Sequence, residues 1–82
     1  MASILVVDDE LSMREFLKIL LEKEGYRVTT AAEGKTALLL AEQHHFDLMI
    51  SDIRMPGMSG LELLAQLKQL QADIGVIMIT AF

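Results

Sequence analysis

The chain has 82 residues, of which 52% are hydrophobic, and its formal net charge is −5. This length suits one small domain, and the hydrophobic content excludes a disordered tail. The acidic balance argues against binding to a nucleic-acid backbone, and the absence of cysteine excludes disulfide and thiolate chemistry. The N-terminus lacks the basic flank of a signal peptide and no apolar run could span a membrane, so we expect a cytoplasmic location without membrane binding.

Short apolar runs alternate with helical patterns along the chain, as in repeated strand–helix–strand units. Strands are predicted at residues 3–7, 26–30, 46–51 and 76–80, and helices at about 13–24, 34–44 and 61–70. The continuous apolar run of the first strand is typical of a strand that is buried on both faces of a parallel sheet. The sequence therefore predicts one α/β domain over residues 1–82.

The first helix has clear predicted ends. Ser12 and Glu15 have the spacing of a capping box, in which each side chain bonds the other residue's free backbone N–H. Gly25 is predicted to end the helix in the left-handed conformation. The apolar residues between these ends fall on one face at helical spacing: Met13, Phe16, Leu17, Ile19, Leu20 and Leu21.

Three aspartates follow two of the predicted strands. Asp8 and Asp9 come directly after the first strand, and Asp52 comes directly after the third. Ligands of open α/β sheets bind beyond the carboxyl ends of the strands, so the three carboxylates should meet if the two strands are neighbours. Three anions so close repel one another unless a cation or a proton intervenes. The sequence predicts either a divalent cation site or a strained acidic cluster.

Mg²⁺ suits such a cluster because it prefers oxygen ligands and retains several waters. Asp9 and Asp52 are the better candidates for direct contact, while Asp8 would bind directly or through water. The backbone carbonyl of Arg54 is a further candidate ligand. Thr80 ends the fourth predicted strand at the same edge, and its hydroxyl could bond an anion held near Asp52.

Together these motifs resemble the receiver domain of bacterial two-component response regulators. The resemblance rests on Asp8-Asp9, on Asp52, on the loop Met-Pro-Gly-Met-Ser-Gly at residues 55–60, and on Thr80-Ala81. Residues 51–56 and 79–82 are most similar to receivers attached to enhancer-binding transcription activators. The resemblance implies a flavodoxin-like, doubly wound parallel sheet with strand order 2-1-3-4.

The resemblance also implies a role for each site residue. Asp52 would accept a phosphoryl group from a phosphohistidine of a sensor histidine kinase, and Thr80 would be the switch hydroxyl. Mg²⁺ would be held by Asp8, Asp9, Asp52 and the carbonyl of Arg54. Such a receiver assists its own phosphorylation and is not a turnover enzyme.

One departure from the family pattern lies at the end of the sequence. Receiver domains usually continue through a further helix, strand and helix, and that strand carries a lysine that pairs with the phosphoryl group. We therefore expect a truncated receiver with impaired signalling. The fourth strand, residues 76–79, would then be an open apolar edge, and it and the sheet face beside the first helix should favour a dimer or higher assembly.

Two other functions stay open at this point. A hydrolase of the haloacid-dehalogenase type would use Asp8 as its nucleophile, but the second acid two residues later is only Glu10. An inert assembly fragment would show no Mg²⁺ response at the three aspartates. A dinucleotide-binding domain is excluded, because no glycine-rich turn follows the first strand.

Overall fold

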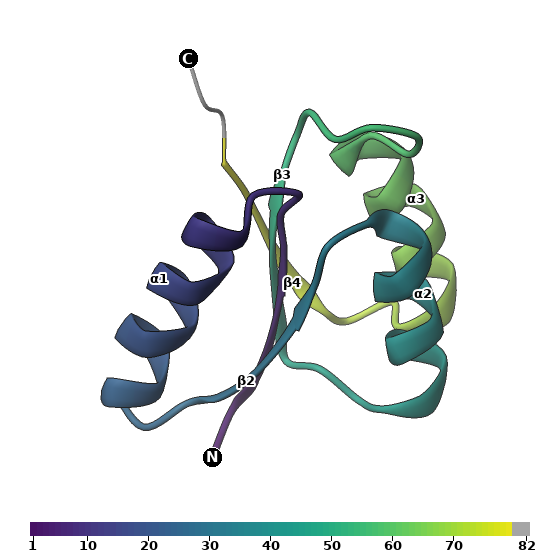
Figure 1. Ribbon diagram of the computed structural model, residues 1–82. Helices are drawn as coiled ribbons and strands as arrows, with labels where there is room; N and C mark the ends of the chain where they lie inside the picture. Colours follow the sequence, from purple (N-terminus) through teal and green to yellow (C-terminus); the bar gives the residue numbers. More distant parts are fainter. Residues whose placement is uncertain (80–82) are drawn as a thin grey trace.

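The computed structural model describes residues 1–79 as a parallel sheet flanked by helices (Figure 1). The elements in chain order are β1 (Ser3–Val7), α1 (Leu11–Lys23), β2 (Arg27–Ala31), α2 (Gly34–Gln43), β3 (Leu48–Asp52), α3 (Gly60–Leu70) and β4 (Gly75–Ile79). The sheet order is β2-β1-β3-β4, and every neighbouring pair is parallel. The predicted α/β class and strand order are confirmed. Thr80, Ala81 and Phe82 lie outside the described residues.

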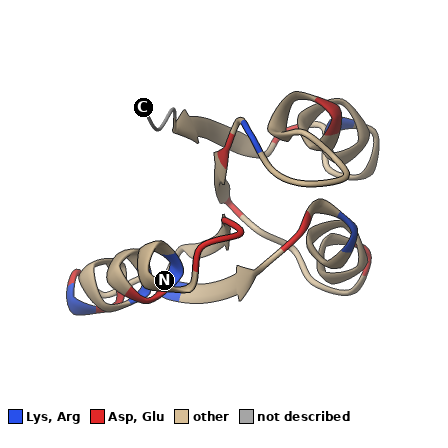
Figure 2. Cartoon of the chain, turned by 45° about the horizontal axis from the view of Figure 1, so that its top comes forward, with Lys and Arg blue, Asp and Glu red and all other residues tan. Residues whose placement is uncertain are grey.

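The helices cover the two faces of the sheet unequally. Helix α1 lies on one face, and α2 and α3 lie side by side on the other (Figures 1 and 2). Successive side chains of β1 serve both faces: Leu5 and Val7 pack with residues of α2 and α3, while Ile4 and Val6 pack with residues of α1. This alternation explains why β1 is a continuous apolar run, since neither of its faces meets water.

Helix α1 begins two residues earlier than predicted and lacks the predicted capping box. Its N-cap is Glu10, no side chain caps the helix, and Ser12 lies inside the first turn. The Asp8 carboxylate accepts from the Glu10 N–H at 2.9 Å, so the turn after β1 leads directly into the helix. A capping box does form at α3, where the Ser59 hydroxyl and the Glu62 carboxylate each bind the other's backbone N–H.

The apolar face of α1 is only partly buried. Leu17 and Leu21 pack against the core beneath the helix, whereas Phe16, Ile19 and Leu20 remain 60%, 63% and 45% exposed. The apolar residues of α1 span more of its circumference than the sheet can cover in residues 1–79. Gly25 ends the helix as predicted, with a φ of +94° and its N–H bound to the Glu22 carbonyl.

Where the structure describes them, the remaining element boundaries lie within two residues of the prediction. Strand β3 begins at Leu48, two residues later than predicted, and the Phe46 N–H before it is bound by the Gln71 side chain. Asp52 belongs to β3 and pairs with Ile79. Within residues 1–79, every helix is too short or too polar to cross a membrane.

Candidate functional site

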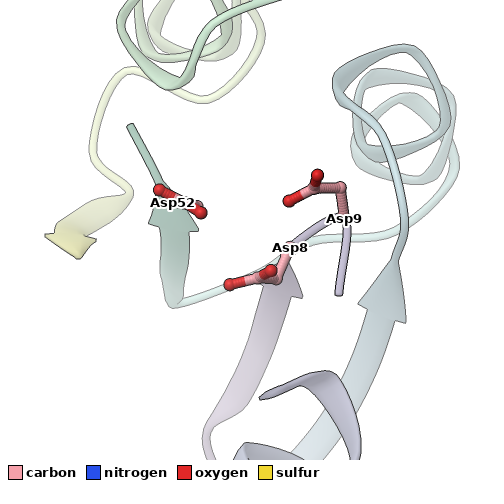
Figure 3. A group of neighbouring side chains, drawn as sticks. All are labelled: Asp8, Asp9 and Asp52. Carbon is pink, nitrogen blue, oxygen red and sulfur yellow. The ribbon is translucent and has the colours of Figure 1, made fainter. Parts of the chain in front are cut away.

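The three aspartates converge at the carboxyl edge of the sheet (Figure 3). Strands β1 and β3 are paired with Val7 opposite Ser51, so Asp8 and Asp52 are the next residues of neighbouring strands. One carboxylate oxygen from each of Asp8, Asp9 and Asp52 lies within 4.8 Å of the others. Figure 2 shows this acidic edge between the helical layers. The predicted acidic cluster therefore exists as a structural feature.

The cluster has a buried floor and an open side. Asp8 is 5% exposed and Asp52 is 7% exposed, whereas Asp9 is exposed to solvent. A ligand can therefore approach past Asp9 while it is held by two carboxylates that are largely shielded from water. Shielding strengthens the attraction between a carboxylate and a cation.

Backbone and side-chain hydrogen bonds hold Asp8 in place. Its N–H donates to the Ala31 carbonyl at 3.1 Å, and its Oδ1 accepts from the Glu10 N–H at 2.9 Å. Its carbonyl accepts from Nη1 of Arg14 at 2.8 Å. These bonds tie the turn that carries Asp8 and Asp9 to both β2 and α1.

The charge of Asp8 is disfavoured by its surroundings. Burial raises the pKa of Asp8 above its ordinary value of 3.8, and the negative charges of Asp52 and Asp9 raise it further. The Glu10 N–H and the Arg14 guanidinium oppose this rise in pKa but do not cancel it. A cation between the three carboxylates would relieve the same repulsion, which is why the arrangement fits a metal.

Asp52 sits at the point where β3 turns into the following loop. Its Oδ1 accepts from the Arg54 N–H at 3.1 Å, which fixes the orientation of the carboxylate. Its backbone carbonyl accepts from the Ser51 hydroxyl at 2.9 Å. In Figure 3 the Asp52 carboxylate faces Asp8 and Asp9 across the end of the sheet. One of its oxygens is anchored while the group as a whole points into the site.

The loop between β3 and α3 folds back onto the end of β3. Gly57 adopts a φ of +82°, which favours glycine, and the Gly60 N–H donates to the Ile53 carbonyl at 2.8 Å. Arg54 lies in this loop, two residues after Asp52. A metal-binding role for its carbonyl stays a prediction, and Thr80 lies outside the described residues.

Two residues that were not predicted as site residues lie against the site. Arg14 holds the Asp8 carbonyl, and Gly60 packs against the backbone of Asp52. An arginine one turn into the helix that follows Asp8-Asp9 was a usable signal for the first. The second contact joins residues eight positions apart through a loop, and the sequence carries no periodic signal for it.

The set of ligands favours a hard cation. Carboxylate oxygens, one of them exposed, together with waters suit Mg²⁺, which needs few protein ligands. A carboxylate beside such a cation can also act as a nucleophile towards phosphorus. The site can thus combine metal binding with phosphoryl transfer.

Comparison with known proteins places the chain in one family. The sequence profile named Response regulator receiver domain matches residues 4–82. Sporulation initiation phosphotransferase F of Bacillus subtilis is 39% identical over 79 residues, which cover 96% of this chain and 64% of that protein. The transcriptional regulatory protein GlrR of Escherichia coli is 39% identical over 80 residues, which cover 98% of this chain and 18% of that protein. The chain thus spans less than two thirds of the length of these relatives.

Solved structures agree in fold as well as in sequence. The response regulator protein TrrA of Thermotoga maritima, solved in complex with Mg²⁺-BeF, is 45% identical with a TM-score of 0.93. That match covers all of this chain and 71% of the TrrA chain. The structure of histidine kinase ThkA in complex with TrrA matches with a TM-score of 0.92, with 45% identity and the same coverage.

Proposed function

The chain belongs to the response regulator receiver domain family of two-component systems, and from that premise we propose that it accepts a phosphoryl group on Asp52 with the help of Mg²⁺. Receiver domains are signalling modules. The observation that carries the proposal is the convergence of Asp8, Asp9 and Asp52, whose oxygens lie within 4.8 Å of one another at the carboxyl edge of the sheet.

Asp52 is the proposed nucleophile. A carboxylate oxygen of Asp52 attacks the phosphorus of a phosphohistidine, the phosphorus–nitrogen bond breaks, and the imidazole leaves as it takes up a proton. The hydrogen bond from the Arg54 N–H to Oδ1 of Asp52 supports this role, because it orients the carboxylate and leaves its other oxygen to react.

Asp8, Asp9, Asp52 and the Arg54 carbonyl are the proposed Mg²⁺ ligands. When bound there, Mg²⁺ would neutralise the charge that develops on the transferred phosphoryl oxygens. The burial of Asp8 and Asp52 supports a cation site, since two carboxylates in so little water repel strongly without one. Thr80 stays the proposed switch hydroxyl.

A sensor histidine kinase is the proposed phosphodonor. The solved complex of histidine kinase ThkA with TrrA supports this class of partner, because TrrA is 45% identical to this chain. The name of GlrR, a transcriptional regulatory protein, supports a role in transcription regulation. We also propose a second copy of this chain as a partner, since within residues 1–79 strand β4 pairs with β3 alone and Ile77 is 50% exposed.

Labelling with a small phosphodonor tests the proposal. The chain is incubated with acetyl phosphate or phosphoramidate and Mg²⁺, and the acyl phosphate is detected by mass spectrometry. Labelling should require Mg²⁺ and disappear in Asp52→Asn, whereas Asp73→Asn, an exposed carboxylate in the α3–β4 connection, should label like the wild type. Labelling that persists in Asp52→Asn would refute the assignment.

A further inference from the structure

Gly60 lies where α3 meets the end of β3. It is the first residue of α3, it is buried, and its N–H donates to the Ile53 carbonyl at 2.8 Å. A β-carbon at this position would lie 2.9 Å from Cα of Ile53 and 3.1 Å from the carbonyl carbon of Asp52, and it would be closer still to the Asp52 carbonyl oxygen. Real β-carbons essentially never make contacts under 3.0 Å, so any side chain here forces a displacement.

The atoms that would be displaced belong to the backbone that carries Asp52. Other tight glycines of the chain face side chains: at Gly34 the nearest atom is Sδ of Met58 at 2.9 Å, and at Gly75 it is Cδ1 of Leu48 at 3.3 Å. A side-chain end can rotate away, whereas the carbonyl of Asp52 can move only if the strand end moves.

Helix α3 has little freedom to retreat instead. Leu63 and Leu67, on its inner face, are fully buried in the core between the sheet and the helices. The capping box of Ser59 and Glu62 further fixes the first turn. The displacement would therefore fall on Asp52 and on the turn in which the Arg54 N–H binds Oδ1 of Asp52.

We propose that Gly60 is a positioning residue for Asp52: because it has no side chain, α3 can pack against the Asp52 carbonyl and hold the carboxylate towards Asp8 and Asp9. The inference rests on the proposed function of Asp52. Reactive groups must be held within about 0.5 Å of the productive geometry, and a misplacement of about 1 Å can cost roughly 100-fold in rate. A methyl group at position 60 is large enough to cause such a shift.

The test compares Gly60→Ala with two matched variants. Gly75→Ala adds the same methyl group to β4, beside Leu48 at the opposite end of β3, and Leu67→Ala destabilises the core without touching the site. Mg²⁺ affinity is measured by calorimetry, and the Arg54 amide is followed by NMR without metal. We expect Gly60→Ala to lose at least about tenfold in Mg²⁺ affinity and to shift the Arg54 resonance, since misplacing one ligand is costly. Both controls should stay within about twofold of the wild type.

A second measurement uses the wild type alone. In the wild type, hydrogen exchange of the Gly60 and Arg54 amides is measured with and without Mg²⁺. If Gly60 holds Asp52, Mg²⁺ should slow both amides by a similar factor. Slowing of the Arg54 amide alone would overturn the inference, as would wild-type Mg²⁺ affinity and an unmoved Arg54 resonance in folded Gly60→Ala.

Failure of the proposed function has a different signature. A wild-type chain that binds no Mg²⁺ and shows no labelling dependent on Asp52 would remove the proposed role of Asp52 itself. In that case the Arg54 resonance in metal-free Gly60→Ala would still show whether Gly60 fixes the Asp52 carboxylate. An unchanged Arg54 resonance in this variant would show that Gly60 does not position Asp52.

Discussion

The carboxylates of Asp8 and Asp52 approach each other from two paired strands, with oxygens within 4.8 Å, although the residues are only 5% and 7% exposed. Two like charges in so little water reduce the stability of the folded chain. Natural folds keep such a cost mainly where function requires it. The site should therefore respond measurably to protons, to charge removal and to divalent cations.

Replacing Asp8 with asparagine should stabilise the metal-free chain at neutral pH. Burial, followed by the charges of Asp52 and Asp9, raises the pKa of Asp8 in the folded state. The folded chain thus keeps this proton to a higher pH than the unfolded chain. Protonated Asp8 therefore favours the folded state, and this stabilisation is lost as pH rises through the raised pKa of Asp8. Asparagine can still accept from the Glu10 N–H but carries no charge. We expect Tm to rise by a few degrees at pH 7, by circular dichroism.

The pH dependence of this gain is the control for its cause. Below the ordinary pKa of 3.8, Asp8 is protonated in both states, so the difference between Asp8→Asn and the wild type should shrink towards zero. Asp73→Asn removes an exposed charge and should show no such trend. A variant that is less stable than the wild type at pH 7 without metal would contradict the prediction.

Mg²⁺ should stabilise the wild type and not a variant that lacks Asp9. A ligand that binds only the folded state adds about 2.7 kcal/mol at 100 times its dissociation constant. Asp9 is exposed and its charge repels Asp8, so Asp9→Ala should not destabilise the metal-free chain while it removes a candidate ligand. Calorimetric Tm values in MgCl₂ and in NaCl of equal ionic strength measure the difference. An equal rise in Tm for Asp9→Ala would remove Asp9 from the ligand set.

Much of the fold and of the site follows from local patterns in the sequence. The apolar run that ends at Asp8 must be buried on both faces, and Ile4, Leu5, Val6 and Val7 are each at most 2% exposed. The carboxyl ends of parallel neighbours lie at one edge, so the meeting of Asp8 with Asp52 could be predicted once the strands were recognised.

What the sequence could not predict depends on how the turns and loops at the ends of the elements close. Ser12 with Glu15 and Ser59 with Glu62 have the same spacing, but only the second pair forms a capping box. The difference is that Asp8 binds the Glu10 N–H and starts α1 before Ser12. The fit of Gly60 against Asp52 likewise appears only when the loop has closed.

Gln71 should matter for stability although it lies far from the site. Its Nε2 donates to the carbonyls of Ala41 at 2.8 Å and His44 at 2.9 Å, and its Oε1 accepts from the Phe46 N–H at 3.1 Å. One side chain thus binds backbone groups at the end of α2 and in the segment that leads to β3. Gln71→Leu should cost about 1–3 kcal/mol in urea unfolding, because it leaves polar backbone groups unpaired.

The control for this prediction is a neighbouring glutamine. Gln69 is exposed on α3, and Gln69→Leu should change the free energy of unfolding by less than about 0.5 kcal/mol. Both variants should bind Mg²⁺ like the wild type, because Gln71 lies at the opposite end of the sheet from the aspartates. Equal stability of Gln71→Leu and the wild type would show that water replaces these three bonds without loss.

A charge on β4 should suppress the proposed self-association. Strand β4 is apolar after Gly75, and in the part of the chain that the structure describes it has one neighbouring strand. Ile77 is half exposed on this strand, and a lysine there opposes edge-to-edge pairing because the charge would have to be buried. Leu39→Lys places the same charge on an exposed position of α2 and serves as the control.

Light scattering at tens of micromolar should give a dimer or larger species for the wild type and Leu39→Lys, and a monomer for Ile77→Lys. A monomeric wild type would refute self-association, and an assembled Ile77→Lys would place the contact elsewhere than on β4.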